Sequence, residues 1–168
     1  MRAIIYTSNT GSTAEYAQLL GNELNLPVHS LQQAKNKVPA GSEIIYLGWI
    51  MAGGIKGYKE AAKLYKVRAV CGVGMGQTGT QLKEVRDKNA IPQRIPLFTL
   101  QGNFDVKKLH GVYRFMMNVM VKTAGKGLAN KTDRTPEEDD MLDMMVNGGK
   151  RVSLQNLKAV TEWYKSIN

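Results

Sequence analysis

Hydroxyl side chains gather in a short segment near the N-terminus, where residues 6–17 read YTSNTGSTAEYA. An apolar run precedes this segment and a helix-like run follows it. The N–H groups at such a helix start carry the positive end of the helix dipole and suit an anion. Lysine and arginine are absent from residues 3–34, so neutral groups would have to hold a phosphate here. The candidate residues are Ser8, Asn9, Thr10, Gly11, Ser12 and Thr13.

Two other interpretations of this anion loop are weaker. A Walker-type loop needs a lysine that reaches the terminal phosphates, followed by Ser or Thr for magnesium, and the segment has no lysine. An ordinary polar turn capped by Ser or Thr would not need four hydroxyls within six residues. Phosphate binding is therefore the favoured interpretation, and Gly11 would let the backbone approach the ligand closely.

A second candidate segment is YLGWIMAGGIKGYK, residues 46–59. A tryptophan, an isoleucine and a methionine directly after a buried strand would be unusual in an exposed turn, but they can form a wall for a planar ring. Two glycines then allow positive φ angles. Taken alone, the segment is ambiguous, because Trp49 is equally suited to filling the core. The candidate residues are Trp49, Ile50, Met51, Ala52, Gly53 and Gly54.

The third candidate segment matches the pattern G-x-G-x-x-G between a predicted strand and a predicted helix, which is the dinucleotide fingerprint. It follows the fourth strand instead of the first, and the next strand ends in Phe98-Thr99-Leu100-Gln101, without an acidic residue for a ribose hydroxyl. These two facts disfavour NAD. A glycine-rich loop that passes close to a flavin ring accounts for the same residues, Gly74, Met75, Gly76, Gln77, Thr78 and Gly79.

The elements that must position these loops alternate regularly. Apolar runs at 3–7, 27–31, 43–49, 68–75 and 95–100 predict strands that are buried on both faces. Segments 14–24, 58–65 and 80–88 predict helices between them. This alternation predicts an α/β fold with a parallel sheet and helices on both faces. Ligands bind such sheets beyond the carboxyl ends of the strands.

The alternation breaks after the fifth strand, where an insertion of about residues 103–152 begins. Residues 106–126 predict a basic amphipathic helix. A second helix is predicted to begin at the Thr135 cap, with Pro136 in its first turn, and to end at Gly148. A last helix is predicted from a Ser153 cap to about Lys165. We expect residues 1–168 to form a single domain with this insertion.

Composition narrows the partners and the compartment. The net charge of +9 would suit nucleic acid, an anionic surface or an acidic partner, but no basic run exceeds two residues, so nucleic acid is disfavoured. The chain has no apolar run long enough to span a bilayer, and its N-terminus turns polar too soon for a signal peptide. The single cysteine, Cys71, lies in an apolar strand and is interpreted as a buried structural thiol. We expect a cytoplasmic protein.

Residues 8–13, SNTGST, match a pattern of a hydroxyl residue, any residue, Thr-Gly, any residue and Thr. With the strand alternation, this segment resembles the phosphate loop of the flavodoxin family. The resemblance implies a doubly wound, flavodoxin-like five-stranded sheet of order 2-1-3-4-5 that binds FMN. Residues 8–13 would hold the phosphate, while 49–54 and 74–79 would flank the isoalloxazine ring. Gly53 or Gly54 would lie beside flavin N5, where a peptide flip stabilises the one-electron-reduced ring.

Two departures from that family concern charge and the insertion, because typical flavodoxins are acidic and lack it. A basic, Met-rich insertion at this point resembles the flavodoxin-like protoporphyrinogen oxidases that use menaquinone. Cationic residues beside an apolar stripe can receive a flat anionic substrate or touch a membrane surface. The alternative is a purely structural role, in which the apolar stripe covers the sheet and the cations lie at its rim. His110 is a weaker candidate for moving protons. The cations are Lys107, Lys108, Arg114 and Lys122, and the stripe includes Leu109, Met116 and Met120.

Three functional hypotheses follow. The first is an FMN-binding redox protein that passes electrons to a partner protein. The second is a flavoenzyme of the protoporphyrinogen oxidase or quinone reductase type, acting on a porphyrin-like or quinone substrate. The third is a binding module whose loop holds another phosphate and does no redox chemistry. The sequence favours the first.

Overall fold

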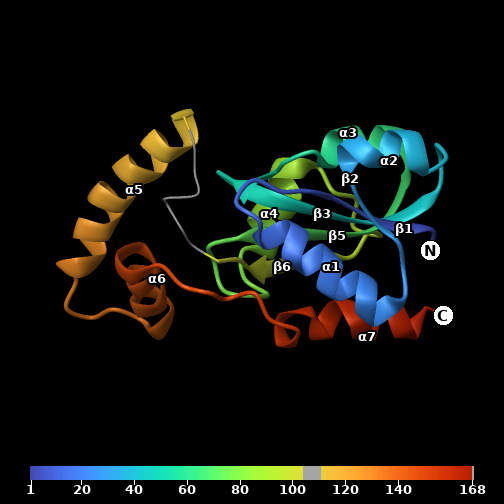
Figure 1. Cartoon of the computed structure of the whole chain (residues 1–168). Helices are drawn as coiled ribbons and strands as arrows, with labels where there is room; N and C mark the ends of the chain where they lie inside the picture. The colour runs from blue at the N-terminus through green and yellow to red at the C-terminus, as the bar shows by residue number, and fades with distance from the viewer. Residues whose placement is uncertain (104–110, 168) are drawn as a thin grey trace.

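The sheet has the predicted strands and the predicted order. The computed structural model describes residues 1–103 and 111–167, without the side chains of 111–114, 116, 117, 120, 124, 137, 146 and 147. Five strands run parallel in the order β2-β1-β3-β5-β6 (Figure 1). They are β1 (Ala3–Thr7), β2 (Val28–Ser30), β3 (Glu43–Met51), β5 (Lys66–Gly74) and β6 (Leu97–Gln101).

Helices cover both faces of this sheet (Figure 1). One face carries α1 and α7, and the other carries α2, α3 and α4. Because successive residues of a strand point to opposite faces, Ile4 joins the apolar cluster beneath α1 and α7, while Ile5 joins the cluster on the other face. The helices are α1 (Ser12–Leu24), α2 (Leu31–Lys37), α3 (Tyr58–Leu64), α4 (Leu82–Asn89) and α7 (Lys158–Ser166).

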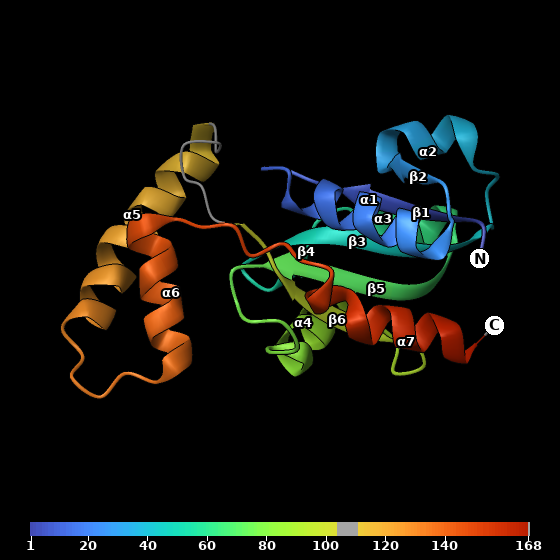
Figure 2. The same ribbon diagram turned by 60° about the horizontal axis from the view of Figure 1, so that its bottom comes forward.

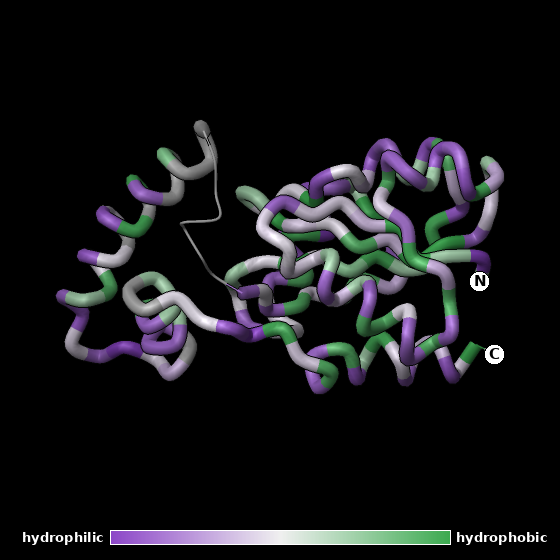
Figure 3. The backbone as a smooth tube through the Cα atoms, viewed as in Figure 1, coloured by the Kyte–Doolittle hydropathy of each residue, from purple (hydrophilic) through white to green (hydrophobic). Residues whose placement is uncertain are grey.

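Hydropathy follows the same division. Figure 3 shows hydrophobic residues along the strands and on the inner sides of the helices, and hydrophilic residues on their outer turns. Tyr16 and Leu20 of α1 and Val160 of α7 are 0% exposed. Cys71 is also fully buried, and burial raises the pKa of its thiol to about 12. The interpretation of Cys71 as a structural thiol is therefore supported.

Two local predictions were wrong and one was confirmed. The sequence-based assignment missed α2, although Ser30 and Gln33 form a capping box at its start. Ser153 does not cap the last helix, because a short 3₁₀ helix (η2, Gln155–Leu157) precedes α7 and no side chain caps either of them. By contrast, Thr135 accepts from the Glu138 N–H as predicted.

The insertion forms a helical hairpin beyond the carboxyl ends of the strands. Its two helices are α5 (Gly111–Ala129) and α6 (Pro136–Asn147), and the chain runs along α5 and returns along α6 (Figures 1 and 2). Gly148 ends α6, with its N–H donating to the Met144 carbonyl. The hairpin stands at the end of the sheet and does not cover either face.

Several predictions about the insertion fall outside the described part of the chain. Lys107, Lys108, Leu109 and His110 lie outside the described residues. The same holds for the side chains of Arg114, Met116 and Met120, whereas Lys122 is described and exposed. None of the helices among the described residues is long and apolar enough to cross a membrane.

Candidate functional site

The three candidate loops meet at one edge of the sheet. They follow β1, β3 and β5, which are adjacent in the order β2-β1-β3-β5-β6. The order reverses at β1 and β3, because β2 lies on one side of them and β5 and β6 on the other. Parallel sheets bind ligands outside the carboxyl ends of the strands at such a switch point.

The anion loop leads directly into α1. Gly11 occupies the N-cap position with φ of 104°, and no side chain in the described part of the chain caps this helix end. The backbone of Gly11 is held by its own loop, because its N–H donates to Ser8 Oγ at 3.3 Å. A Cβ added at Gly11 would meet nothing within 4 Å. The first turn of α1 therefore offers N–H groups beside open space.

The hydroxyls of the anion loop divide into two groups. Ser8 and Thr10 are half-buried, whereas Ser12 and Thr13 are only 6% and 1% exposed. Ser12 Oγ accepts from the Asn103 N–H at 3.0 Å, which ties α1 to the chain leaving β6. Of the predicted hydroxyls, Ser8 and Thr10 are the more accessible to a ligand.

A cleft of about 660 Å³ opens on the β2 side of the anion loop. It brings Ser8, Asn9 and Gly11 together with Lys35 of α2 and Glu60 of α3. Lys35 Nζ lies 2.6 Å from Glu60 Oε1, so the lysine charge is already paired. The sequence analysis missed both residues, and the capping box at Ser30 was the signal that could have placed Lys35 on a helix.

The second loop is shorter than predicted, because β3 does not end at Trp49 but continues through Ile50 and Met51. A two-residue strand, β4 (Gly54–Ile55), pairs back on it antiparallel, so the true turn is Ala52-Gly53. Both turn residues have positive φ, 46° and 75°. The physical reason is the antiparallel pairing of Ile50 with Ile55 and of Met51 with Gly54, which keeps these residues in the strand.

Side chains of this hairpin have different surroundings. Ile50 packs against the buried cluster and lies directly over Gly72, where an added Cβ would come within 2.8 Å of Ile50 Cδ1. Trp49 is half-buried, and Lys56 Nζ lies 5.7 Å from the centroid of its ring. Trp49 is thus the aromatic group that this hairpin places at the carboxyl edge, while Ile50 contributes mainly to the core.

Asn89 of α4 holds the hairpin turn, a role that the sequence analysis missed. Its amide nitrogen donates to the Gly53 carbonyl at 2.8 Å, and its amide oxygen accepts from the Ile55 N–H at 2.8 Å. Asn89 is only 6% exposed. Nothing local in the sequence marks it, because its partners lie about 35 residues earlier in the chain.

The glycine-rich loop is fastened to β6. The Gly79 N–H donates to the Thr99 carbonyl at 3.0 Å, and Thr78 Oγ1 accepts from the Gln101 N–H at 3.0 Å. Met75 and Gln77 are half-buried. These bonds position the loop beside the β3–β4 hairpin without any acidic residue in it.

A buried tyrosine links the anion loop to the hairpin. The Tyr46 hydroxyl is 2.8 Å from Thr7 Oγ1 and 2.7 Å from the Lys56 carbonyl oxygen, to which it donates. Burial raises the pKa of Tyr46 well above its usual value. Its hydroxyl therefore stays protonated and acts as a structural link between β1 and the β4–α3 connection.

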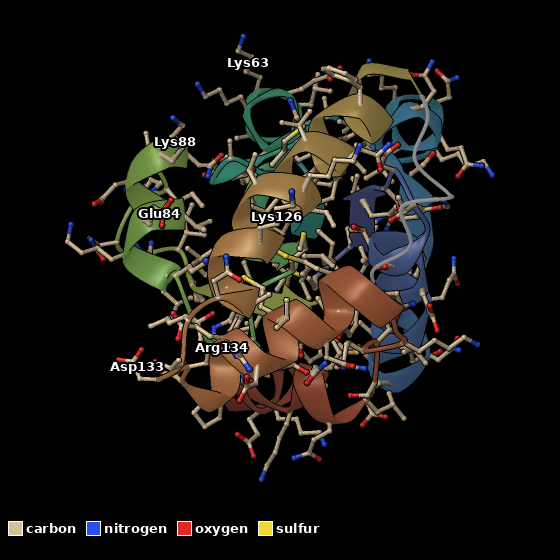
Figure 4. All side chains as sticks on the ribbon, turned by 90° about the vertical axis from the view of Figure 1, so that its left-hand side faces the viewer. Lys63, Glu84, Lys88, Lys126, Asp133 and Arg134 are labelled. Carbon is tan, nitrogen blue, oxygen red and sulfur yellow. The ribbon has the colours of Figure 1, made fainter. Side chains whose placement is uncertain are left out.

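The helical hairpin stands over the same edge of the sheet. Figure 4 looks at the molecule from that end and shows Lys126 of α5 in front of the sheet, with Glu84 and Lys88 of α4 to one side. The described residues contain no cluster of three or more His, Cys, Asp or Glu that could hold a metal ion.

Comparison with known proteins gives one family. A family model described as a flavodoxin domain matches residues 3–131, which is well over half of the chain. The match includes the anion loop, the β3–β4 hairpin and the glycine-rich loop. Searches among curated proteins and among solved structures returned no significant match.

Proposed function

This chain belongs to the flavodoxin-domain family, and we propose that it is an FMN-binding redox protein that passes electrons through its flavin. One observation carries the proposal. The anion loop, the β3–β4 hairpin and the glycine-rich loop follow adjacent strands at the point where the strand order reverses. When bound, FMN would supply electron transfer through its isoalloxazine ring.

The residues at this edge fit such a cofactor. The start of α1, without a side-chain cap, and the open space beside Gly11 suit a phosphate, with Ser8 and Thr10 as hydroxyl donors. Trp49 would stack on the ring or border it, and Met75 and Gln77 would lie on its other side. The protein's part is to bind and orient the cofactor at these loops.

The absorption spectrum of the purified protein tests the proposal directly. We expect flavin absorption bands and release of a compound with the mass of FMN. A colourless protein that also fails to bind added FMN would refute both redox hypotheses and leave a binding module for another phosphate compound.

A substitution in the anion loop tests the phosphate site. Thr10→Ala is expected to weaken FMN binding by about 1 to 3 kcal/mol, because a hydrogen bond to a charged acceptor is lost. Thr161→Ala on α7 is the matched control, since its hydroxyl bonds only within its own helix to the Lys158 carbonyl. Equal FMN affinity for both variants in a fluorescence titration would mean that the loop does not bind the phosphate.

A flavoenzyme is the second candidate function, favoured by the position of the helical hairpin. A carrier needs an accessible cofactor edge, whereas α5 and α6 stand beyond the edge where the proposed cofactor loops lie (Figure 1). A hairpin in this position would border a flat substrate, such as a porphyrin-like compound or a quinone, that approaches the proposed cofactor. Multiple turnovers with protoporphyrinogen and a quinone acceptor would support the enzyme. Electron transfer to redox proteins alone, without turnover of either small molecule, would support the carrier.

A further inference from the structure

The Asn89 side chain makes three hydrogen bonds, which use both of its N–H donors and one of the two acceptor positions on its oxygen. Its amide nitrogen donates to the Gly53 carbonyl at 2.8 Å and to the Val85 carbonyl at 2.7 Å, and its oxygen accepts from the Ile55 N–H at 2.8 Å. Rotating the amide by 180° would set donor against donor and acceptor against acceptor, so its orientation is chemically determined. Asn89 therefore holds the β3–β4 hairpin through Gly53 and Ile55, the residues on either side of Gly54.

The turn that Asn89 grips contains a residue in an unfavourable conformation. Ala52 and Gly53 both have positive φ, as in a type I′ turn. An Ala-Gly pair is better suited to a type II turn, in which only the second residue needs positive φ. Ala52 is therefore strained by its Cβ, whereas Gly53 is relaxed in either turn type.

The two residues of the turn also differ in their surroundings. On the α4 side, a Cβ at Gly53 would lie 3.4 Å from Glu84 Oε1 and 3.6 Å from Lys88 Cγ. Ala52, in contrast, is exposed. The strained residue is thus the one with room to change its dihedral angles, and the relaxed residue is the one held by α4.

We propose that Asn89 is a positioning residue that fixes the Ala52-Gly53 turn by holding the Gly53 carbonyl and the Ile55 amide. Asn89 thereby determines which backbone group the turn presents to the cofactor ring. The effect of Asn89 on the cofactor ring rests on the proposed FMN function. The hydrogen bonds by which Asn89 holds the turn do not depend on it. Of the two glycines named in the sequence analysis, Gly53 is the one whose carbonyl Asn89 holds.

Two variants separate the bonds that Asn89 makes. Asn89→Ala removes all of them. Asn89→Asp keeps an acceptor for the Ile55 N–H but loses both donors, so it releases the Gly53 and Val85 carbonyls while the bond to Ile55 remains. Asn36→Ala, at an exposed position of α2, is the matched control for truncating a helical asparagine.

Hydrogen exchange on the protein without FMN tests whether Asn89 holds the turn. We expect the Ile55 amide to exchange at least tenfold faster in Asn89→Ala than in the wild type, and to stay protected in Asn89→Asp and Asn36→Ala. If the Ile55 amide exchanged equally slowly in Asn89→Ala, the inference that Asn89 holds the turn would be wrong. This measurement does not depend on whether FMN binds.

Potentiometry on the FMN-loaded protein tests the positioning role. The difference between the potentials for the first and the second electron reports how strongly the protein stabilises the one-electron-reduced flavin. We expect this gap to narrow in Asn89→Asp, because the turn is then less ordered and contacts the ring less favourably. The gap should stay unchanged in Asn36→Ala. A gap that is equal to or wider than the wild-type gap in Asn89→Asp would overturn the inference. If the wild type binds no FMN, the proposed function and the ring part of the inference fail together, and hydrogen exchange still decides the grip.

Discussion

The sheet region (residues 1–103 and 151–167) and the helical hairpin of α5 and α6 are stabilised in different ways. The sheet region has an apolar cluster on each face, in which side chains such as Ile45 and Leu47 are 0% exposed. In the hairpin, Phe115 is 68% exposed and Val119 is 45% exposed. Met144 and Met145 of α6, by contrast, are 0% and 7% exposed. Because apolar burial is the main stabilising term in folding, Phe115 and Val119 contribute less to stability than the sheet clusters, and the hairpin also relies on a polar connection to the sheet.

That connection is concentrated at one point, where the chain leaves the sheet and returns to it. Asn103 Oδ1 accepts from the Arg151 N–H at 2.6 Å and from the Val152 N–H at 3.0 Å. Asp140 of α6 accepts from Gln101 Nε2 at 2.6 Å and pairs with Arg151 at 3.1 Å. The hairpin is therefore attached through hydrogen bonds and ion pairs beside the N-terminus of α1.

The two hairpin helices also differ in charge. Within 111–129 the sequence has basic residues and no acidic one, whereas 136–147 has acidic residues and no basic one. Opposite charges meet in the connection, where Lys131 pairs with Glu138 at 2.8 Å and Arg134 with Asp139 at 2.6 Å. The two regions therefore differ in what stabilises them: apolar clusters in the sheet region, and a larger share of charged and polar contacts in the hairpin.

The largest effect is expected on the free energy of unfolding when an apolar side chain is truncated in the sheet and, for comparison, in the hairpin. Leu47→Ala should lower the free energy of unfolding by roughly 2 to 5 kcal/mol, since it leaves a cavity in a packed core. Val119→Ala should change it by less than about 0.5 kcal/mol, because that side chain is already exposed. Guanidinium denaturation measures both. Similar losses in the two variants would break the comparison.

A smaller effect is expected at the connection. Asn103→Ala should cost roughly 1 to 3 kcal/mol, because the Arg151 and Val152 N–H groups lose their shared acceptor. Hydrogen exchange should show faster exchange of these two amides, with little change in β1 or β3. Asn130→Ala, at an exposed position after α5, is the control. Uniformly faster exchange throughout the sheet would mean that the connection is part of the core.

The ion pair between Arg151 and Asp140 should contribute less. Its side chains are 28% exposed, so we expect a coupling of up to about 1 kcal/mol that decreases with salt. A double-mutant cycle with Arg151→Met and Asp140→Asn at low and high salt measures it. A coupling that does not depend on salt would indicate that the pair is shielded from solvent.

The smallest expected effect is a pH dependence that differs between the regions. In the sheet, burial followed by the Lys37 charge lowers the pKa of His29 from 6.5, so the unfolded state binds more protons and stability falls as pH decreases through about 6.5. In the hairpin, the hydrogen bond from Lys131 lowers the pKa of Glu138 from 4.5, so its contribution is lost only below that pH. His29→Gln should flatten the first slope in pH-dependent denaturation. An unchanged slope would exclude His29 as its source.

Prediction from the sequence succeeded where the signal was local. The five strands were recognised from continuous apolar runs, and the cap at Thr135 from hydrogen bonds within a single turn. Some failures were local, such as the missed helix α2, and others concern contacts between distant segments, such as the bonds of Asn89 to Gly53 and Ile55. The continuation of β3 to Met51 was missed because Ile50 and Met51 were interpreted as a ring wall in a loop, whereas they pair with the short strand Gly54–Ile55.

The sequence by itself determined the alternation of strands and helices, the neutral anion loop and the burial of Cys71, because each follows from apolar periodicity or from residue types within a few positions. Only the tertiary structure decided that Lys35 lines the cleft beside the anion loop and that Asn89 holds the Ala52-Gly53 turn. The physical reason is that a hydrogen bond or ion pair between distant segments leaves no periodic pattern in either one. Such contacts exist only after the sheet has brought the segments together.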